Sequence, residues 1–314
     1  MESPETAKGK PTVIIDGTCF TLVLERQRGV GLYADANRSR YLRIGDAAFV
    51  LKELGFHKRL ERMGFPVAKI LREGEYQGDK YWIEESLGDS HFTERFERDV
   101  REAGEISDTS FARWLRHVTA FANAQARGSE LRAVNLDALA RYVGVEGMQE
   151  ERPELRAAIR EGFQKASKRI AEWPTCLTHG DLTSHNILDN GVIDFGDHFE
   201  GPLGYDVVTA ITVPFWFSPD PSFEIIQRYR FSPGQIETYL NAFRVLETPA
   251  GTFTLDDAFD DLFFLKANWW SVKNQQMPKL QEWRYTLFQG ILERYLDGES
   301  LLDYWASTQK KIST

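Results

Sequence analysis

Polar side chains that suit one kind of chemistry recur at fixed intervals in a short part of the sequence. The segment His179-Gly-Asp181 is followed five residues after its aspartate by Asn186, and then by Val192-Ile-Asp194-Phe-Gly196. Phosphoryl transfer requires a carboxylate that orients and deprotonates the accepting hydroxyl, ligands for a metal ion on the nucleotide phosphates, and a cation. The spacing therefore predicts Asp181 as the base, with Asn186 and Asp194 as Mg²⁺ ligands through their side-chain oxygens.

Each half of this pattern also has a purely structural explanation. A single His-x-Asp is usually a capped turn, and Asp-Phe-Gly is common by chance. Leu188-Asp-Asn-Gly191 carries the Asn-Gly signal of a tight hairpin, so that loop, strands and carboxylates all fall within His179–Gly196. Because both motifs occur together and in order, close enough to share one metal ion, the functional interpretation is favoured.

The residues before the motif predict a small β-rich lobe with one helix. Between residues 12 and 45, short apolar runs alternate with glycine-containing turns, which is typical of antiparallel strands. A helix is expected from Ala47 to about Met63, where Gly64 and Pro66 end it. Two further strands are expected at Val67–Leu71 and Lys80–Ile83.

Helical periodicity dominates the sequence after Ser90. Apolar residues between Phe111 and Ala122 form one stripe, which predicts an amphipathic helix with its cap among Asp108-Thr-Ser110. Another helix is expected from about Pro153 to Glu172, and the chain beyond about Pro233 is expected to be helical. The expected domains are a disordered lead at 1–11, an amino-terminal lobe at 12–88 and a carboxy-terminal lobe at 89–314.

Composition and charge narrow the class of protein. The 314 residues are 42% apolar and 27% charged, which is typical of a soluble globular protein with more than one core. A net charge of −9 argues against nucleic-acid binding, which depends on Lys and Arg. Without a long apolar run or an apolar signal segment, we expect a cytoplasmic protein that does not bind membranes. Cys19 and Cys176 are expected to be buried free thiols, and nothing in the sequence bears on the oligomeric state.

The catalytic-loop and metal motifs, together with Gly204-Tyr-Asp206 downstream, resemble those of the aminoglycoside phosphotransferase and choline kinase family, relatives of the protein kinases. Glycine after His179, where protein kinases carry arginine, favours the small-molecule branch. The resemblance implies an α+β, bilobal, protein kinase-like fold with a small β-rich amino-terminal lobe and a larger, mainly helical carboxy-terminal lobe. It also implies a catalytic loop containing His179, a bracing role for Asp206, and ATP or GTP bound with Mg²⁺.

In this family a lysine or arginine on the third strand binds the nucleotide phosphates and pairs with a helix glutamate. Arg43 occupies the matching place, and arginine can bind phosphate oxygens bidentately. Glu53 is the matching acid, with Glu61 as the competitor. The alternative is an edge-strand arginine beside a solvated helix face.

The remaining nucleotide contacts are expected in two segments of the first lobe. Gly29 and Gly31 are placed to cover the phosphates, although an ordinary hairpin explains them equally well. Glu84 and Ser86 lie in the segment that resembles the family's interlobe hinge, and we expect their backbone groups to bind the nucleotide base.

The resemblance places the acceptor between the catalytic loop and the carboxy-terminal helices. Acidic residues of one helix there, among them Asp257 and Asp261, can bind the ammonium groups of an aminoglycoside, or remain solvated and stabilise the helix dipole. Trp269 and Trp270 can form a cage for a quaternary ammonium such as choline, or fill the core. Residues next to the catalytic groups that are expected to line the pocket are His185, Asp197, His198 and Glu200.

The sequence therefore predicts a phosphotransferase that moves the γ-phosphoryl group of ATP or GTP to a hydroxyl of a small acceptor. An aminoglycoside is the first acceptor to consider, and choline, another amino alcohol or a sugar is the alternative. Arg43 and the sparse glycine loop motivate a second hypothesis, a nucleotide-binding pseudokinase. The His-Gly-Asp variant argues against a third, a protein kinase proper.

Overall fold

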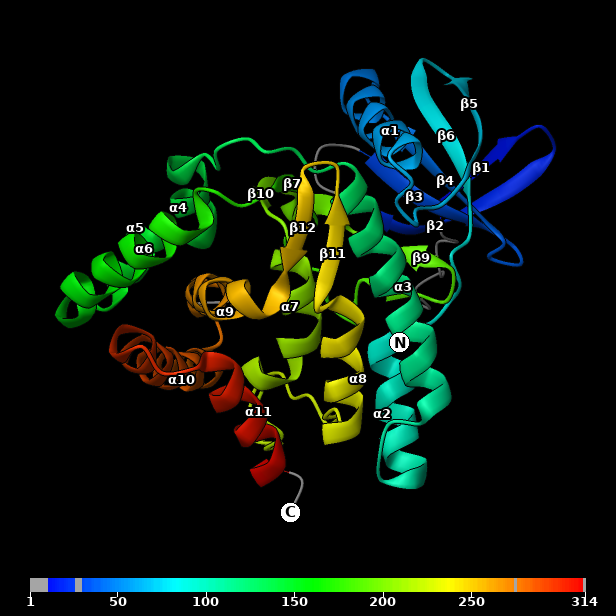
Figure 1. Ribbon diagram of the computed structural model, residues 1–314. Helices are drawn as coiled ribbons and strands as arrows, with labels where there is room; N and C mark the ends of the chain where they lie inside the picture. Colours follow the sequence, from blue (N-terminus) through cyan, green and yellow to red (C-terminus); the bar gives the residue numbers. More distant parts are fainter. Residues whose placement is uncertain (1–10, 26–29, 274–275, 313–314) are drawn as a thin grey trace, which may run out of the picture. The chain divides into compact units, whose positions relative to one another are not determined.

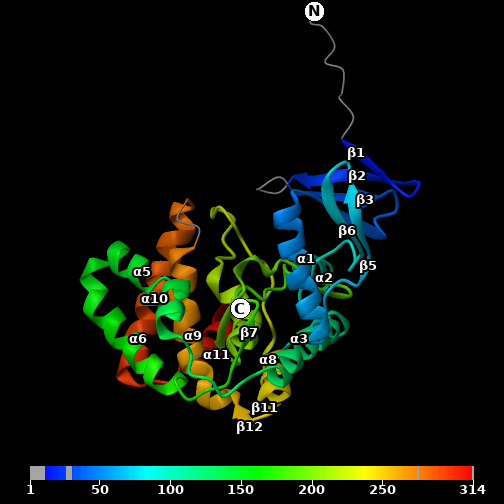
Figure 2. The same ribbon diagram turned by 90° about the horizontal axis from the view of Figure 1, so that it is seen from above.

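The computed structural model describes residues 11–25, 30–273 and 276–312 (Figures 1 and 2). The chain divides into two compact units. The first runs to Asp89 and includes Leu188–Val192, and the second comprises Ser90–Ile187 and the residues from Ile193 onward. Of the predicted lead, residues 1–10 lie outside the described residues, whereas the Pro11 carbonyl accepts a hydrogen bond from the Leu22 N–H at 2.9 Å.

The first unit is a six-stranded antiparallel sheet in the order β1-β2-β3-β4-β6-β5, with one helix, α1. Apolar side chains are buried on both faces of the sheet, and those of Val30 and Trp82 pack with Val50 and Leu54 of the helix. The Asp46 carboxylate caps α1 by accepting from the Ala48 N–H at 2.9 Å. The elements are β1 (Thr12–Ile15), β2 (Thr18–Glu25), β3 (Val30–Asp35), β4 (Arg40–Gly45), α1 (Ala47–Arg62), β5 (Ile70–Tyr76) and β6 (Asp79–Glu85).

A hairpin from the middle of the chain completes the first unit. It is formed by β8 (Ile187–Leu188) and β9 (Gly191–Val192), as the Asn-Gly turn predicts. The Val192 N–H donates to the Pro66 carbonyl at 2.7 Å, and the Asn190 N–H donates to the Leu87 carbonyl at 2.9 Å. Any side chain at Gly191 would collide with the Pro66 carbonyl, so glycine is required at this close approach.

The second unit is mainly helical, and α9 lies at its centre, packed against α5, α6, α7, α10 and α11. Some of its buried polar side chains bind backbone carbonyls, because unpaired polar groups are costly in a core. For example, Asn268 Nδ2 donates to the Val143 carbonyl at 2.6 Å. The helices are α2 (Phe92–Ala103), α3 (Asp108–Arg127), α4 (Leu136–Val143), α5 (Val145–Glu151), α6 (Arg156–Ile170), α7 (Tyr205–Thr212), α8 (Pro233–Phe243), α9 (Leu255–Val272), α10 (Pro278–Asp297) and α11 (Leu301–Ile312).

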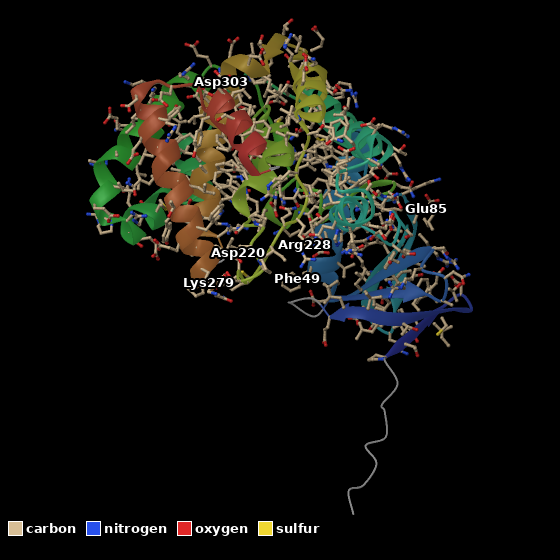
Figure 3. All side chains as sticks on the ribbon, turned by 90° about the horizontal axis from the view of Figure 1, so that it is seen from below. Phe49, Glu85, Asp220, Arg228, Lys279 and Asp303 are labelled. Atoms are coloured by element: carbon tan, nitrogen blue, oxygen red, sulfur yellow. The ribbon has the colours of Figure 1, made fainter. Side chains whose placement is uncertain are left out.

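Short strands and single turns of 3₁₀-helix connect these helices. The pair β7–β10 is antiparallel and joins the two sides of the catalytic segment. Lys279, at the start of α10, donates to the Ser222 carbonyl at 2.8 Å and so attaches the loop that contains Asp220 (Figure 3). The remaining elements are β7 (Thr175–Thr178), β10 (Phe199–Pro202), β11 (Val245–Thr248), β12 (Gly251–Thr254), η1 (Pro153–Leu155), η2 (Phe195–Asp197) and η3 (Val213–Trp216).

Several local predictions were wrong. The hydroxyl that caps α3 belongs to Ser107, which accepts from the Ser110 N–H, and not to a residue within 108–110. The segment expected to be helical after Pro233 contains the hairpin β11–β12, in which Leu246 and Phe253 pair and are both buried. Cys19 is exposed because β2 alternates its faces and the neighbouring Phe20 occupies the core.

The predicted α+β, kinase-like fold class is confirmed by the small antiparallel β unit and the larger helical unit. No helix in the described part of the chain is both long and apolar enough to cross a membrane.

Candidate active site

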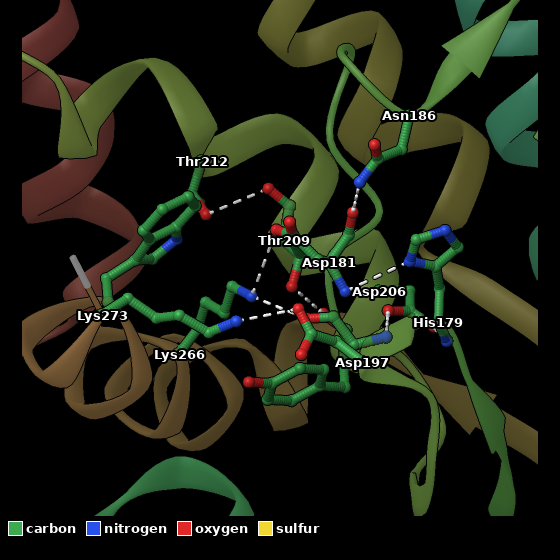
Figure 4. A network of polar contacts seen from close by, with 12 residues as sticks. His179, Asp181, Asn186, Asp197, Asp206, Thr209, Thr212, Lys266 and Lys273 are labelled. Atoms are coloured by element: carbon green, nitrogen blue, oxygen red, sulfur yellow. Dashed lines mark hydrogen bonds and ion pairs between the residues drawn. The ribbon is translucent and has the colours of Figure 1, made fainter. Parts of the chain in front are cut away.

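The segment His179–Asn186 forms a loop between β7 and β8, and the Asp206 carboxylate at the start of α7 holds its first residues. Asp206 Oδ2 accepts from the His179 N–H at 2.6 Å, and Oδ1 accepts from the Gly180 N–H at 2.8 Å (Figure 4). Gln125 Nε2 also donates to Oδ2, at 2.7 Å. Burial raises the pKa of Asp206, and these three donors oppose the rise because they favour the ionised form. The loop thus rests on a buried carboxylate.

Gly180 is the residue that allows this turn. Its φ is +83°, a left-handed conformation that glycine adopts without strain. A β-carbon there would collide with the Tyr142 hydroxyl and the Asp197 carbonyl. The glycine that distinguishes this sequence from protein kinases is therefore required by both the backbone and its neighbours.

His179 is a structural member of the loop. It is fully buried, and its Nδ1 accepts from the Asp181 N–H at 3.2 Å. Nε2 therefore carries the proton and donates to the Ile193 carbonyl at 2.8 Å. The imidazole links the loop to the residue just before Asp194 and leaves neither nitrogen for proton transfer.

Asp181 presents one carboxylate oxygen outward and the other inward. The side chain is 26% exposed, yet Oδ1 is buried and has no hydrogen-bond partner among the described residues. The exposed part of the carboxylate is therefore on the Oδ2 side. A carboxylate whose free oxygen is accessible and whose backbone is fixed suits a general base.

Asn186 and Asp194 carry the oxygen atoms that suit a metal ion. Asn186 Nδ2 donates to the Asp181 carbonyl at 2.8 Å, which turns Oδ1 of the amide away from the loop (Figure 4). The Ile193 N–H donates to the Asn186 carbonyl at 2.9 Å, and Asp194 follows, exposed, with φ 61°. One amide oxygen and one carboxylate fit Mg²⁺, which takes few protein ligands and completes its shell with phosphate and water.

The described part of the chain contains no cluster of three or more His, Cys, Asp or Glu side chains that could hold a metal ion by itself. Asn186 and Asp194 stay predicted Mg²⁺ ligands. Two thirds of the chain, residues 33–242, match the family model described as the phosphotransferase enzyme family. The chain belongs to the phosphotransferase enzyme family.

Solved structures agree on the fold of this phosphotransferase. An ethanolamine kinase from Plasmodium vivax is 13% identical, with a TM-score of 0.52 over 87% of this chain and 84% of that one. A putative aminoglycoside phosphotransferase from Ralstonia eutropha is 12% identical, with a TM-score of 0.52 over 96% and 94%. A search of the curated proteins gave no match. The predicted family and its kinase-type activity on hydroxyl groups of small molecules are confirmed.

A lysine that no sequence motif indicates lies next to the catalytic loop of the phosphotransferase. Lys266, in the middle of α9, is fully buried and donates from Nζ to the Gly180 carbonyl at 2.7 Å. The same Nζ is 4.0 Å from Asp181 Oδ1 and 3.3 Å from the ring centroid of Trp269. Burial lowers the pKa of Lys266 to about 7. A titratable cation therefore stands directly beside the predicted base.

The tryptophans do not form an open ammonium cage. Trp270 is buried, and the guanidinium of Arg284 lies 4.6 Å from its ring centroid. Lys266 lies on the Trp269 ring, and Lys273 Nζ is 4.2 Å from the same centroid. The chain's own cations thus occupy the positions that choline would take, and the prediction of Trp270 as a substrate contact is wrong.

Two of the acidic residues of α9 bind other parts of the protein. Asp261 is fully buried, accepts from the Tyr295 hydroxyl, and lies 3.2 Å from Arg169 Nε, so its prediction as a substrate ligand is wrong. Asp260 accepts from the Leu301 N–H at 2.9 Å at the start of α11. Asp257 is exposed and remains a prediction.

Some of the side chains after the metal motif already have partners within the protein. Asp197 Oδ2 pairs with Lys273 Nζ at 2.8 Å (Figure 4), and both side chains remain partly exposed. His198 is exposed, and its Nδ1 contacts the Phe195 carbonyl at 2.6 Å. Glu200 pairs with Arg132. Asp197 and His198 stay predicted acceptor contacts, whereas Glu200 is engaged elsewhere.

In the first unit, Arg43 pairs with a different acid from the one predicted. Arg43 Nε donates to Glu84 Oε1 at 3.0 Å, and Trp82 Nε1 donates to Glu84 Oε2 at 2.9 Å. Glu53 is half-exposed on α1 and forms no ion pair with Arg43 among the described residues. Adjacent strands bring Arg43 and Glu84 together, because Arg43 pairs with Trp82 and the side chain two residues on lies on the same face.

The backbone groups predicted to bind the base are largely engaged. The Ser86 N–H donates to the Ser39 carbonyl at 2.9 Å, and a contact of the Ser86 backbone with the base stays a prediction. Glu84 lies within β6, paired with Tyr41 on one side and Ile70 on the other. Of the glycines, Gly29 lies outside the described residues, and Gly31 is part of β3.

The titration of Lys266 predicts a pH dependence of stability. Its pKa is about 7 when folded and 10.5 in its ordinary state. Below about pH 7 both states hold the proton, and the full cost of burying the cation is present. Between these values the unfolded state holds more protons, so the free energy of unfolding rises with pH. Urea denaturation measures the free energy of unfolding of wild type and of Lys266→Met. We expect the difference, wild type minus variant, to rise by up to about 1.4 kcal/mol per pH unit above pH 7. A flat difference between pH 7 and 9 would contradict the assignment.

Proposed function

We propose that this phosphotransferase transfers the γ-phosphoryl group of Mg²⁺-bound ATP or GTP to a hydroxyl of a small acceptor, with Asp181 as the base. The observation that carries the proposal is the link between Asn186 Nδ2 and the Asp181 carbonyl, 2.8 Å long. Because of this hydrogen bond, the base and the amide oxygen suited to the metal are presented by one rigid loop. Positioning of that kind is most of what a phosphotransferase contributes to the reaction.

The proposed transfer uses the exposed oxygen of Asp181. It accepts a hydrogen bond from the acceptor hydroxyl, orients the attacking oxygen and takes its proton as the new O–P bond forms. The bond between the γ-phosphorus and the bridging oxygen breaks, and the nucleoside diphosphate leaves. Asn186 and Asp194 would hold Mg²⁺, which when bound neutralises charge on the phosphate oxygens. Arg43 would give up Glu84 to bind the phosphates.

The acceptor that these contacts favour carries several hydroxyl groups. The faces of Trp269 and Trp270 are covered by Lys266, Lys273 and Arg284, which disfavours a quaternary ammonium. Hydrogen-bonding groups remain accessible at Asp197 and His198. We therefore place sugars and amino sugars, aminoglycosides included, ahead of choline and ethanolamine.

A panel of acceptors tests the proposal. Wild type is incubated with Mg²⁺ and ATP or GTP, together with single aminoglycosides, neutral sugars, choline and ethanolamine, and the products are identified by mass spectrometry. We expect a product heavier by one phosphoryl group from the sugar class. Product from choline alone would overturn the acceptor class. Nucleotide binding without any product would favour the pseudokinase.

Removal of the Arg43 guanidinium is expected to weaken nucleotide binding. Arg43→Met loses a charge-assisted contact to phosphate, so the Kd for ATP or GTP should rise by about 10–100-fold. Calorimetry with Mg²⁺ present measures the change. Arg40→Met is the matched control, because Arg40 lies on the same strand and pairs with Asp35 at 3.1 Å. Equal effects of the two substitutions would show that Arg43 has no phosphate contact.

A further inference from the structure

The peptide groups of Gly180 are held by two opposite buried charges. Its N–H donates to Asp206 Oδ1 at 2.8 Å, and its carbonyl accepts from Lys266 Nζ at 2.7 Å. Asp206 and Lys266 are both fully buried. The Asp206 carboxylate accepts from the N–H and the Lys266 ammonium donates to the carbonyl, and a charge on one partner strengthens each hydrogen bond. The residue next to Asp181 is thus fixed from both sides.

Burying the charged side chain of Lys266 at this place in the fold costs free energy. An ammonium loses its hydration when buried, and that loss is recovered only through close partners. The aromatic rings of Trp269, Trp270 and Tyr205 surround Nζ at 3.3, 5.2 and 5.4 Å from their centroids. Among the described residues, its one direct hydrogen bond goes to the Gly180 carbonyl. A neutral side chain would fill the space at lower cost, which indicates a role for the charge.

The group on which this charge can act is the inner oxygen of Asp181. Oδ1 is buried, has no hydrogen-bond partner among the described residues, and lies 4.0 Å from Lys266 Nζ. The neighbouring cation Lys273 is engaged with Asp197 at 2.8 Å. Arg284 donates to the Trp216, Trp270 and Lys273 carbonyls, and its charge also acts on Asp181, although the two form no ion pair among the described residues. The charged groups that act on Lys266 are Asp181, Asp206, Lys273 and Asp197.

We propose that Lys266 is a positioning residue for phosphoryl transfer, which holds the Gly180 carbonyl and attracts the inner oxygen of Asp181 so that the outer oxygen faces the acceptor. The proposal rests on the proposed role of Asp181 as the base. Lys266 is fully buried and so touches neither nucleotide nor acceptor. Its effect belongs to the transfer step and not to substrate binding.

Two substitutions separate the charge from the hydrogen bond. Lys266→Gln retains a donor for the Gly180 carbonyl without the charge, and Lys266→Met removes both. We expect kcat to fall by about 100-fold in the Met variant, the typical effect of a misplaced catalytic group, and by less in the Gln variant. The KM for nucleotide should stay within twofold, since Arg43, Asn186 and Asp194 remain. Lys168→Gln, an exposed lysine of α6, is the control for loss of one charge.

Turnover is measured as ADP or GDP release with water as the acceptor, and again with the best acceptor of the panel, after thermal melting shows that the variants are folded. The deciding measurement adds Lys266→Met to Asp181→Asn. If Lys266 acts through Asp181, the double variant loses little beyond Asp181→Asn alone. Independent, multiplying losses overturn the proposal, as does a raised nucleotide KM with unchanged kcat. If Asp181→Asn alone leaves turnover intact, the proposed function fails instead.

Discussion

Asp181→Asn is expected to lower kcat by about 10²–10⁴-fold, the usual contribution of a positioned general base. The amide retains the size of the side chain but cannot take the proton of the acceptor hydroxyl. The Asp181 carbonyl still accepts from Asn186 Nδ2, so the metal-binding oxygens keep their places. The Kd for Mg²⁺-nucleotide should therefore change by less than about threefold while turnover collapses. Initial rates and calorimetry on the same preparation measure both quantities.

The control for this substitution is Asp220→Asn, because Asp220 lies on an exposed loop and accepts from the Ser222 N–H. It should retain wild-type kcat. A comparable loss in both variants, or a wild-type rate in Asp181→Asn, would remove Asp181 from the mechanism.

Asp206→Ala is expected to lower the free energy of unfolding by about 3–5 kcal/mol, because a buried donor left without an acceptor costs about 1–3 kcal/mol. Three N–H donors, from His179, Gly180 and Gln125, lose their acceptor in the core. Lys266 also loses a buried negative neighbour. Because the catalytic loop rests on these contacts, turnover should disappear even where the variant is folded.

Urea denaturation of Asp206→Ala is compared with that of Asp256→Ala. Asp256 also lies in the first turn of a helix, but it is exposed and 3.5 Å from Arg244, so its removal should cost at most about 1 kcal/mol. A cost of similar size at Asp206 would show that the loop does not depend on it.

The arrangement of the predicted catalytic loop could be anticipated because its residues lie in one short segment. Asp181, Asn186 and Asp194 lie within fourteen residues, counted from 181 to 194, and the connecting Asn-Gly turn has few alternatives. A fixed spacing in a short segment translates directly into neighbours in space. The fold class followed for a similar reason, since strand-like and helix-like periodicities occupy separate parts of the chain.

The partners of these residues could not be predicted, because they come from distant parts of the sequence. Lys266 is 86 residues from Gly180, and Glu84 is 41 residues from Arg43. A lysine in a helix usually lies on the solvent-exposed face, and only the hydrogen bond of Lys266 to the Gly180 carbonyl shows that it lies beside the loop. Glu84 is a second example. Its position in the sequence predicts that its backbone binds the base, whereas the structure shows that its side chain pairs with Arg43.

Two predicted acceptor contacts were wrong because their sequence pattern fits both a ligand site and a buried core. Asp261 and Trp270 stand on α9 with a spacing that suits a ligand site equally well as a core. Burial decides between these meanings: Asp261 is 0% exposed and Trp270 is 5% exposed. Burial depends on which helices cover α9, and that information is spread over the whole second unit.

The fate of the γ-phosphoryl group is the most direct test of the central claim that the loop at His179–Asn186 catalyses transfer to a hydroxyl. Wild type and Asp181→Asn are incubated with Mg²⁺, nucleotide labelled in its γ-phosphate and the acceptor panel, and the label is followed by chromatography. We predict that wild type moves the label onto a small acceptor and that Asp181→Asn moves less than about one hundredth as much. Label that remains on the nucleotide in wild type, or equal transfer by both proteins, would contradict the claim.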